Sequence, residues 1–142
     1  DRETKQARSM VVDRVSVDSI MPIVKANIAR EAQLMTDQAM HYRKIGADFS
    51  AHHTVNHATG EYVRKGQPEI HTNTVENYFS VFKRGMKGTY QHCGHNHLNR
   101  YLAEFDFRYN NRAALEVSDQ QRAENLLSGV VGKRLTYQTI GA

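Results

Sequence analysis

The chain has little of what marks secreted, membrane-bound or disulfide-rich proteins. Cys93 is its only cysteine, so an internal disulfide is excluded and a reducing compartment is favoured. No apolar run approaches the roughly 20 residues that a membrane-spanning helix needs, and the opening residues DRETKQARS lack the apolar centre of a signal peptide. These absences predict a cytoplasmic protein with no membrane segment.

Positive charge is in moderate excess. The 142 residues include 19 Lys and Arg against 15 Asp and Glu, and eight histidines can add charge at mildly acidic pH. Such a balance favours polyanionic partners, although a small excess alone does not identify a nucleic-acid-binding protein. The length, with 39% hydrophobic residues, suits one domain with a moderate core.

Residues 1–70 are predicted to alternate between strands and helices. A β-branched run at 7–15 indicates a strand. Ser16 offers a helix N-cap, but Pro22 is tolerable only in a first turn, which moves the expected start of this helix nearer Ser19. The pattern then predicts a strand within 32–39 that ends at Asp37, a short helix at 41–46, a strand at 49–57 and an exposed loop at 58–70.

Three helices are predicted beyond residue 71. The first has an apolar face and an opposite polar face, and the second repeats the apolar spacing. The positions are Val75, Tyr78, Phe79, Phe82 and Met86 (first apolar face), Asn73, Glu76, Ser80, Lys83 and Lys87 (polar face), and Leu98, Tyr101, Leu102, Phe105 and Tyr109 (second helix). The third should begin after Ser118, with Gln121 completing a capping box, and end at Gly129. The order predicts a mixed α/β domain at 1–115 and a helical extension at 116–142.

Glu76 and Lys83 lie seven residues apart on the polar face of the first of these helices. Seven residues make almost two turns, so both side chains project from nearly the same side, roughly 10 Å apart along the axis. That spacing suits one extended polyanion, with the carboxylate acting through a divalent metal and the ammonium on a phosphate. Asp37, at a strand end, could add a second carboxylate, and oxygen ligands suit Mg²⁺ or Mn²⁺ better than Zn²⁺. A solvated helix face is the commoner explanation for an isolated pair of this kind.

Several motifs in a fixed order resemble one family. They are LMTDQAMHYRKIG (34–46), HHTVNH (52–57), HTNTVENYFSVFKRGMKGTYQH (71–92) and LNRYLAEFDFRYNNR (98–112). Over about residues 10–113 the chain resembles the catalytic domain of bacterial insertion-sequence transposases of the DDE superfamily, in a branch with the signatures HTN-x-x-E, KRG-x-x-GTY and FRYN-x-R. The resemblance implies an RNase H-like mixed sheet flanked by helices. It also implies a nucleoid-associated protein that acts on transposon ends and target DNA, usually as a homo-oligomer.

The resemblance also implies roles for single residues. Asp37 matches the second acidic residue of the family, Glu76 the third, and Lys83 a basic residue that touches DNA. Some relatives are described with Asn as the third ligand, so Asn73 is kept as a further metal ligand, although a carboxylate binds Mg²⁺ more strongly than an amide. The implied chemistry is two-metal phosphoryl transfer, in DNA cleavage and strand transfer, with Mg²⁺ or Mn²⁺ as cofactor.

The first acidic residue of the family has no clear match in this chain. It should lie on a strand well before Asp37, and the chain begins where the second strand of the family should be ending. Asp13 and Asp1 are weak substitutes, because one precedes the first helix and the other lies on a polar turn. We therefore expect a domain without its first strand, inactive alone. The alternative is a non-catalytic DNA-binding or assembly remnant of a transposase.

The remaining basic and histidine residues have competing interpretations. Five are predicted to contact DNA, which would make binding salt-dependent, although surface solvation or packing explains the same residues. These are Lys83, Arg84, Lys87, His71 and Arg112. Of the histidines at 52, 53, 57 and 71, His71 is the best candidate for catalysis because it adjoins Asn73 and Glu76. The run HCGHNH (92–97) could suggest zinc, but one cysteine in a short loop fits a tetrahedral site poorly.

Overall fold

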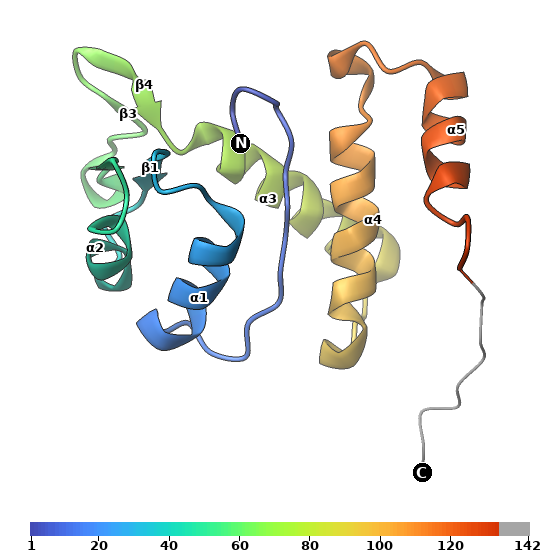
Figure 1. Ribbon diagram of the computed structural model, residues 1–142, viewed down its shortest axis with the longest axis horizontal. Coiled ribbons are helices and arrows are strands. Elements are labelled where there is room, and N and C mark those ends of the chain that lie inside the picture. Colours follow the sequence, from blue (N-terminus) through green and yellow to red (C-terminus); the bar gives the residue numbers. More distant parts are fainter. Residues whose placement is uncertain (134–142) are drawn as a thin grey trace.

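The computed structural model describes residues 1–133 and has a mixed α/β architecture, as predicted. The strands lie with α1 and α2 on one side of the molecule, α4 and α5 lie on the other, and α3 runs between them (Figure 1). The helices are α1 (Val17–Asn27), α2 (Met40–Gly46), α3 (Asn73–Gly85), α4 (Leu98–Asn110) and α5 (Asp119–Ser128). The strands are β1 (Gln33–Thr36), β2 (Ala51–Thr54), β3 (Val63–Arg64) and β4 (Gln67–His71). Short turns of helix are η1 (His57–Thr59), the π-helical η2 (Met86–Tyr90), η3 (His95–His97) and η4 (Ala113–Leu115).

Two small sheets form in the described residues. β1 pairs with β2 in parallel, with Thr36 opposite Thr54, and the Val55 N–H extends the ladder to the Thr36 carbonyl at 3.0 Å. β3 and β4 form an antiparallel hairpin at 63–71, largely within the segment 58–70 that the sequence predicted as an exposed loop. Gly66, at φ +80°, makes the tight turn possible, and a Gly- and Lys-rich composition hid these short strands.

The segment 7–15, predicted as a strand, contains no strand. Its backbone groups bond to side chains of α4 instead of to a neighbouring strand. Asn110 accepts from Ala7 N–H at 2.7 Å and donates to the Ala7 carbonyl at 2.8 Å, while Asp106 accepts from Ser9 N–H at 2.7 Å. The N-terminal segment consequently runs as an extended strap across the helices (Figure 1).

Helix α1 begins at Val17, earlier than the start near Ser19 that Pro22 suggested. Ser16 is the N-cap, and its hydroxyl oxygen accepts from Ser19 N–H at 3.2 Å. Pro22 lies inside the helix and has no N–H to offer the Asp18 carbonyl, but Asp18 is exposed, so water can take the place of the lost donor. The N-cap at Ser16 therefore sets the start of α1, and Pro22 does not.

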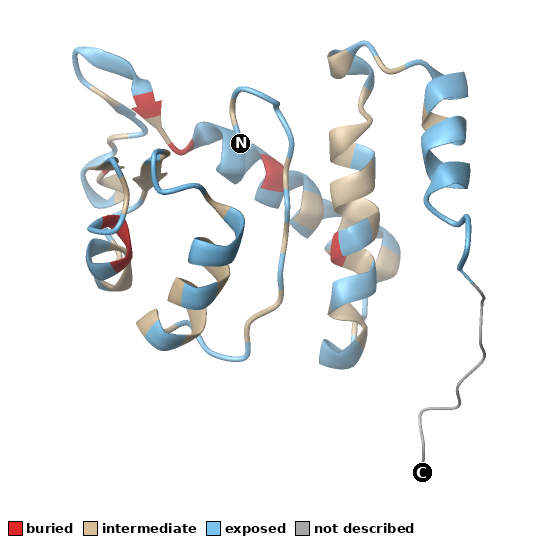
Figure 2. Ribbon diagram, viewed as in Figure 1, coloured by how far each residue is buried: buried red, intermediate tan, exposed pale blue. Residues whose placement is uncertain are grey.

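The core is small and divided between the two sides of the molecule. Ile45, Val55 and Ile70, each at most 2% exposed, come from elements around the sheets, whereas Tyr78 and Leu102 lie on α3 and α4 (Figure 2). The predicted apolar face of α3 is only partly buried, because Val75 and Phe79 are 48% and 44% exposed.

Helices α3 and α4 pack through aromatic rings and one glycine. The rings of Phe82 and Phe105 meet edge to face with centroids 5.1 Å apart, and those of Tyr78 and Tyr109 do so at 5.3 Å. Gly85 gives Phe105 room, since a Cβ there would lie 2.3 Å from the ring.

The C-terminal helix follows its sequence signals. Ser118 and Gln121 form both halves of the capping box of α5, and Gly129 is its C-cap, as predicted. The proposed extension 116–142 is described only to residue 133, so its last residues lie outside the described part and the boundary at 115 stays a prediction. Within the described residues, no helix is both long and apolar enough to cross a bilayer.

Candidate functional site

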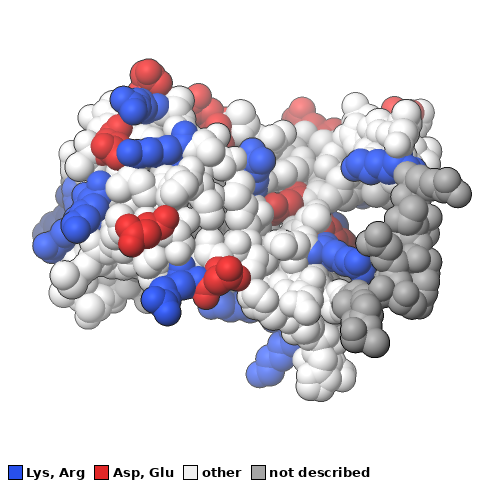
Figure 3. Space-filling view, turned by 60° about the horizontal axis from the view of Figure 1, so that its bottom comes forward, with Lys and Arg blue, Asp and Glu red and all other residues white. Residues whose placement is uncertain are grey.

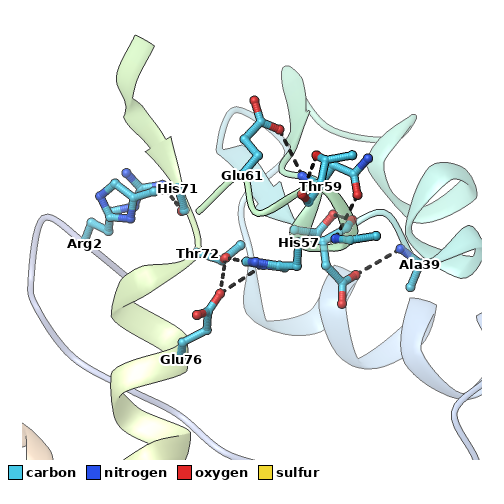
Figure 4. Close-up of polar contacts among 12 residues, drawn as sticks. Arg2, Ala39, His57, Thr59, Glu61, His71, Thr72 and Glu76 are labelled. Carbon is cyan, nitrogen blue, oxygen red and sulfur yellow. Dashed lines mark hydrogen bonds and ion pairs between the residues drawn. The ribbon is translucent and has the colours of Figure 1, made fainter. Parts of the chain in front are cut away.

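Glu76 lies in the first turn of α3 and forms a compact cluster with Thr72 and His57 (Figure 4). The Thr72 hydroxyl donates to Glu76 Oε1 at 2.6 Å, and His57 Nε2 lies 3.0 Å from the same oxygen and 2.9 Å from Thr72 Oγ1. Because a carboxylate only accepts, Nε2 must carry a proton to bond it. The cluster holds one carboxylate oxygen and leaves the side chain of Glu76 43% exposed.

Local structure explains why these three side chains meet. Thr72 is the N-cap of α3 and is only 7% exposed. Its hydroxyl donates to Glu76, and its oxygen accepts no capping bond from a backbone N–H of α3. The helix N-terminus also favours a carboxylate electrostatically. His57 begins η1, where Asn56 caps the turn through Ala58 N–H at 3.0 Å.

Asp37 directly follows β1, at the C-terminal end of the strand, as predicted. Its Oδ1 accepts from Ala39 N–H at 3.0 Å, and the residue is exposed. Burial raises the pKa of the nearby Tyr42 hydroxyl, and the negative charge of Asp37 raises it further.

The parallel pairing of β1 and β2 brings Asp37 and His57 to the same end of the sheet, beyond the C-termini of the two strands. Thr36 is opposite Thr54, so the residues after each strand emerge together. Figure 4 draws Ala39, which donates to Asp37, on the far side of His57 from Glu76. Among residues 1–133 no group of three or more His, Cys, Asp or Glu side chains could hold a metal, so a site shared by Asp37, Glu76 and Asn73 stays a prediction.

The predicted DNA-contacting residues of α3 and η2 are accessible. Lys83, Arg84 and Lys87 are exposed, and none of them forms an ion pair within the described chain. Positive side chains do not form one continuous patch on the face in Figure 3, where acidic side chains lie between them. Any contact of these basic residues with a polyanion would therefore involve local pairs of side chains instead of a broad positive surface.

His71 and Arg112 are engaged with the protein itself. The His71 carbonyl accepts from Arg2 at 3.1 Å, and its ring Nδ1 is buried with no partner in the described residues. Arg112 donates to the carbonyls of Tyr109 at 2.6 Å and Lys5 at 3.1 Å, and its guanidinium lies 4.0 Å from the centre of the Tyr109 ring. Packing explains Arg112 directly, and its contact with DNA stays a prediction.

The comparison with protein families decides the identification. Residues 1–110 match the ISXO2-like transposase domain. The chain belongs to this family of insertion-sequence transposases. The resemblance inferred from the motifs is thereby confirmed. Comparison with curated proteins and with solved structures finds no match.

In this transposase domain, His57 contacts Glu76, whereas the sequence favoured His71 as the histidine candidate for catalysis, and a catalytic role for His71 stays a prediction. His71 is closer to Glu76 in sequence, but His57 makes the contact, and the same His57 nitrogen lies 2.9 Å from Thr72 Oγ1. Thr72 was missed altogether. The four-residue spacing between Thr72 and Glu76, one helical turn, was the available signal.

Proposed function

We propose that this transposase domain contributes Asp37 and Glu76 to metal-dependent phosphoryl transfer on DNA, in an RNase H-like fold. The observation that carries the proposal is the Glu76 cluster at the N-terminus of α3, joined through His57 to the sheet edge where Asp37 emerges. Membership of a transposase family makes DNA the substrate class.

The donor chemistry of the two carboxylates fits a hard divalent cation. Asp37 Oδ2 and Glu76 Oε2 form no hydrogen bond within residues 1–133, and both residues are exposed. Mg²⁺ and Mn²⁺ accept a few carboxylate oxygens and fill their remaining positions with water. Asp37 and Glu76 would hold the ion, with Asn73 at the start of α3 as a further oxygen donor.

The chain's own groups would position that chemistry. When bound, divalent ions stabilise charge on the attacking and leaving oxygens of an in-line displacement. Thr72 and His57 restrain Glu76 Oε1, which turns Oε2 toward incoming ligands without a new ordering cost at each encounter. Lys83, about two turns further along α3, would neutralise a phosphate of the same strand.

We further propose that this chain alone cleaves DNA poorly, because it supplies two of the three acidic groups of the family. Asp13 lies in an exposed bend before α1, and Asp1 accepts from Glu3 N–H and Thr4 N–H in a polar turn. Within the described residues, neither carboxylate forms a hydrogen bond or ion pair with Asp37, Glu76 or His57. A DNA-binding or assembly role without catalysis remains the second candidate function.

A nicking assay separates the two functions. End-containing DNA is incubated with Mn²⁺ and either this chain or a form extended upstream of residue 1 by its adjoining coding sequence. Nicking by the extended form that is lost in its Glu76→Gln variant supports the catalytic role. Nicking by this chain without the extension would contradict the proposal that it supplies too few acidic groups for cleavage. DNA binding with no nicking by either form would favour the assembly role.

A further inference from the structure

An open hollow of about 450 Å³ lies where α3 and η2 meet the beginning of α4. Its lining is mainly apolar, with a basic rim. The lining side chains are Phe82, Met86 and Leu98, together with Lys83, Lys87, Gln91 and Cys93. We call it the α3–η2 hollow.

The rim of the α3–η2 hollow is positively charged. Lys83 and Lys87 are one helical turn apart on a continuous helical segment, so they project on the same side. Both are exposed, no acidic residue lines the hollow, and neither lysine forms an ion pair with another described residue. The charge suits an anionic ligand, and the apolar lining suits a flat, weakly polar group.

Gln91 is placed on this lining by an unusual turn. It has φ +57°, and His92 N–H donates to the Tyr90 carbonyl at 2.6 Å, which makes a γ-turn centred on Gln91. The Gln91 N–H also donates to the Met86 carbonyl at 2.8 Å and closes η2. A primary amide both donates and accepts, which matches the edge of a nucleobase.

We propose that the α3–η2 hollow binds an unstacked nucleobase of a DNA strand, with Lys83 and Lys87 on neighbouring phosphates; this rests on the proposed function, in which DNA is the substrate. Fully paired DNA presents phosphates but no free base face, so it could use the lysines and not the apolar lining. An unpaired nucleotide supplies both a phosphate and a base that packs on apolar side chains. The hollow therefore distinguishes unpaired from paired DNA.

Cys93 gives a direct test, because it lines the hollow and is the only cysteine of the chain. The rate at which a maleimide modifies Cys93 is measured with no DNA, with a blunt duplex, with the same duplex carrying unpaired terminal nucleotides, and with a single strand. Unpaired nucleotides should slow modification at least fivefold, and the blunt duplex should slow it less than twofold. Equal protection of Cys93 by the blunt duplex, the duplex with unpaired ends and the single strand would mean that the hollow binds only phosphates. That result would overturn the proposed nucleobase site.

Two variants separate the charged and apolar parts of the site. Met86→Gln keeps the side-chain length but makes the lining polar, and should remove the preference for unpaired DNA while leaving blunt-duplex affinity within twofold. Lys87→Gln should weaken the binding of every form of DNA, and should reduce the slope of log affinity against log salt concentration by about one. Lys44→Gln, at an exposed lysine of α2, is the matched control. Absence of any DNA binding would contradict the proposed function. Binding with Cys93 unprotected, or an unchanged preference in Met86→Gln, would contradict the hollow alone.

Discussion

Two polar clusters involve α3, and they differ in how fully their carboxylates are satisfied. Glu76 uses one oxygen, Oε1, for both Thr72 and His57, and its side chain stays 43% exposed. Asp106 instead uses both oxygens. Oδ1 accepts from the Ser9 hydroxyl at 2.8 Å and the Tyr78 hydroxyl at 2.6 Å, and Oδ2 accepts from Ser9 N–H at 2.7 Å. A free oxygen suits ligand binding, and a saturated carboxylate suits structure.

The two clusters also differ in what they connect. Glu76 meets residues 4 and 19 positions away, whereas Asp106 joins the N-terminal strap, α3 and α4 across as many as 97 residues. Long-range bonds of this kind restrain the fold, because they join the N-terminal segment to helix α4, which lies about 100 residues further along the chain. The DFRYN-containing motif therefore has a structural role, since Asn110 and Arg112 bind the backbone of Ala7 and Lys5.

The largest effect should come from breaking the saturated cluster. Asp106→Asn places an amide NH₂ against at least one of the groups that now donate to the carboxylate. That partly buried donor then loses its hydrogen-bond acceptor. We expect a loss of about 2–3 kcal/mol in the free energy of unfolding, measured by urea denaturation followed by circular dichroism. Asp13→Asn, in an exposed bend, should change stability by less than about 0.5 kcal/mol. Equal stability of the two variants would show that the strap does not restrain the fold.

The α3–α4 contact gives the next effect. Gly85→Ala would set a Cβ 2.3 Å from Phe105, so the ring or the helix must shift, and overpacking should cost about 1–3 kcal/mol despite the better helix propensity of alanine. Gly88→Ala, three residues on, meets nothing within 4 Å and is the matched control. Thermal unfolding should show a lower midpoint for the first variant and an equal or higher one for the second. A stabilised Gly85→Ala would mean that the close approach is not maintained.

The sequence predicted the elements whose signals are local. α3, α4 and α5 have long apolar periods or a capping box, and the strand before Asp37 ends where expected. Prediction from the sequence failed where residues far away in the chain determine the local structure. The segment 7–15 looks like a strand, but its hydrogen bonds go to side chains about 100 residues away, which no local pattern reveals.

The candidate site shows the same division. Asp37 and Glu76 were identified from resemblance and spacing, and the structure gives each a position that local patterns predicted, after a strand and in a first helical turn. His57 and Thr72 depend on how η1 turns back toward α3, and single residues in turns carry no periodic signal. The hairpin at 63–71 was missed because its two short strands lie in a Gly- and Lys-rich stretch.

The open cluster should respond to mutation in binding more than in stability. Thr72→Val removes the hydroxyl that donates to Glu76 Oε1 but keeps the side-chain shape. Loss of one orienting partner should weaken Mn²⁺ binding about tenfold, measured by calorimetric titration, while the urea midpoint changes little. Thr74→Val, exposed one position beyond Asn73, is the control and should bind as the wild type does. Thr72→Ser should restore affinity, and unchanged affinity in Thr72→Val would remove Thr72 from the site.

The smallest effect, visible only at high pH, tests whether Tyr78 is held by the saturated cluster. Burial, with the hydrogen bond to Asp106, raises the pKa of Tyr78 to about 12 from its ordinary value of 10. The folded state then holds the phenolic proton more tightly than the unfolded state does, so this contribution to stability is complete below pH 10 and is lost as pH rises toward 12. The difference in free energy of unfolding between wild type and Tyr78→Phe should therefore shrink across that window. A constant difference for Tyr78→Phe would mean that its hydroxyl is not held by the Asp106 cluster.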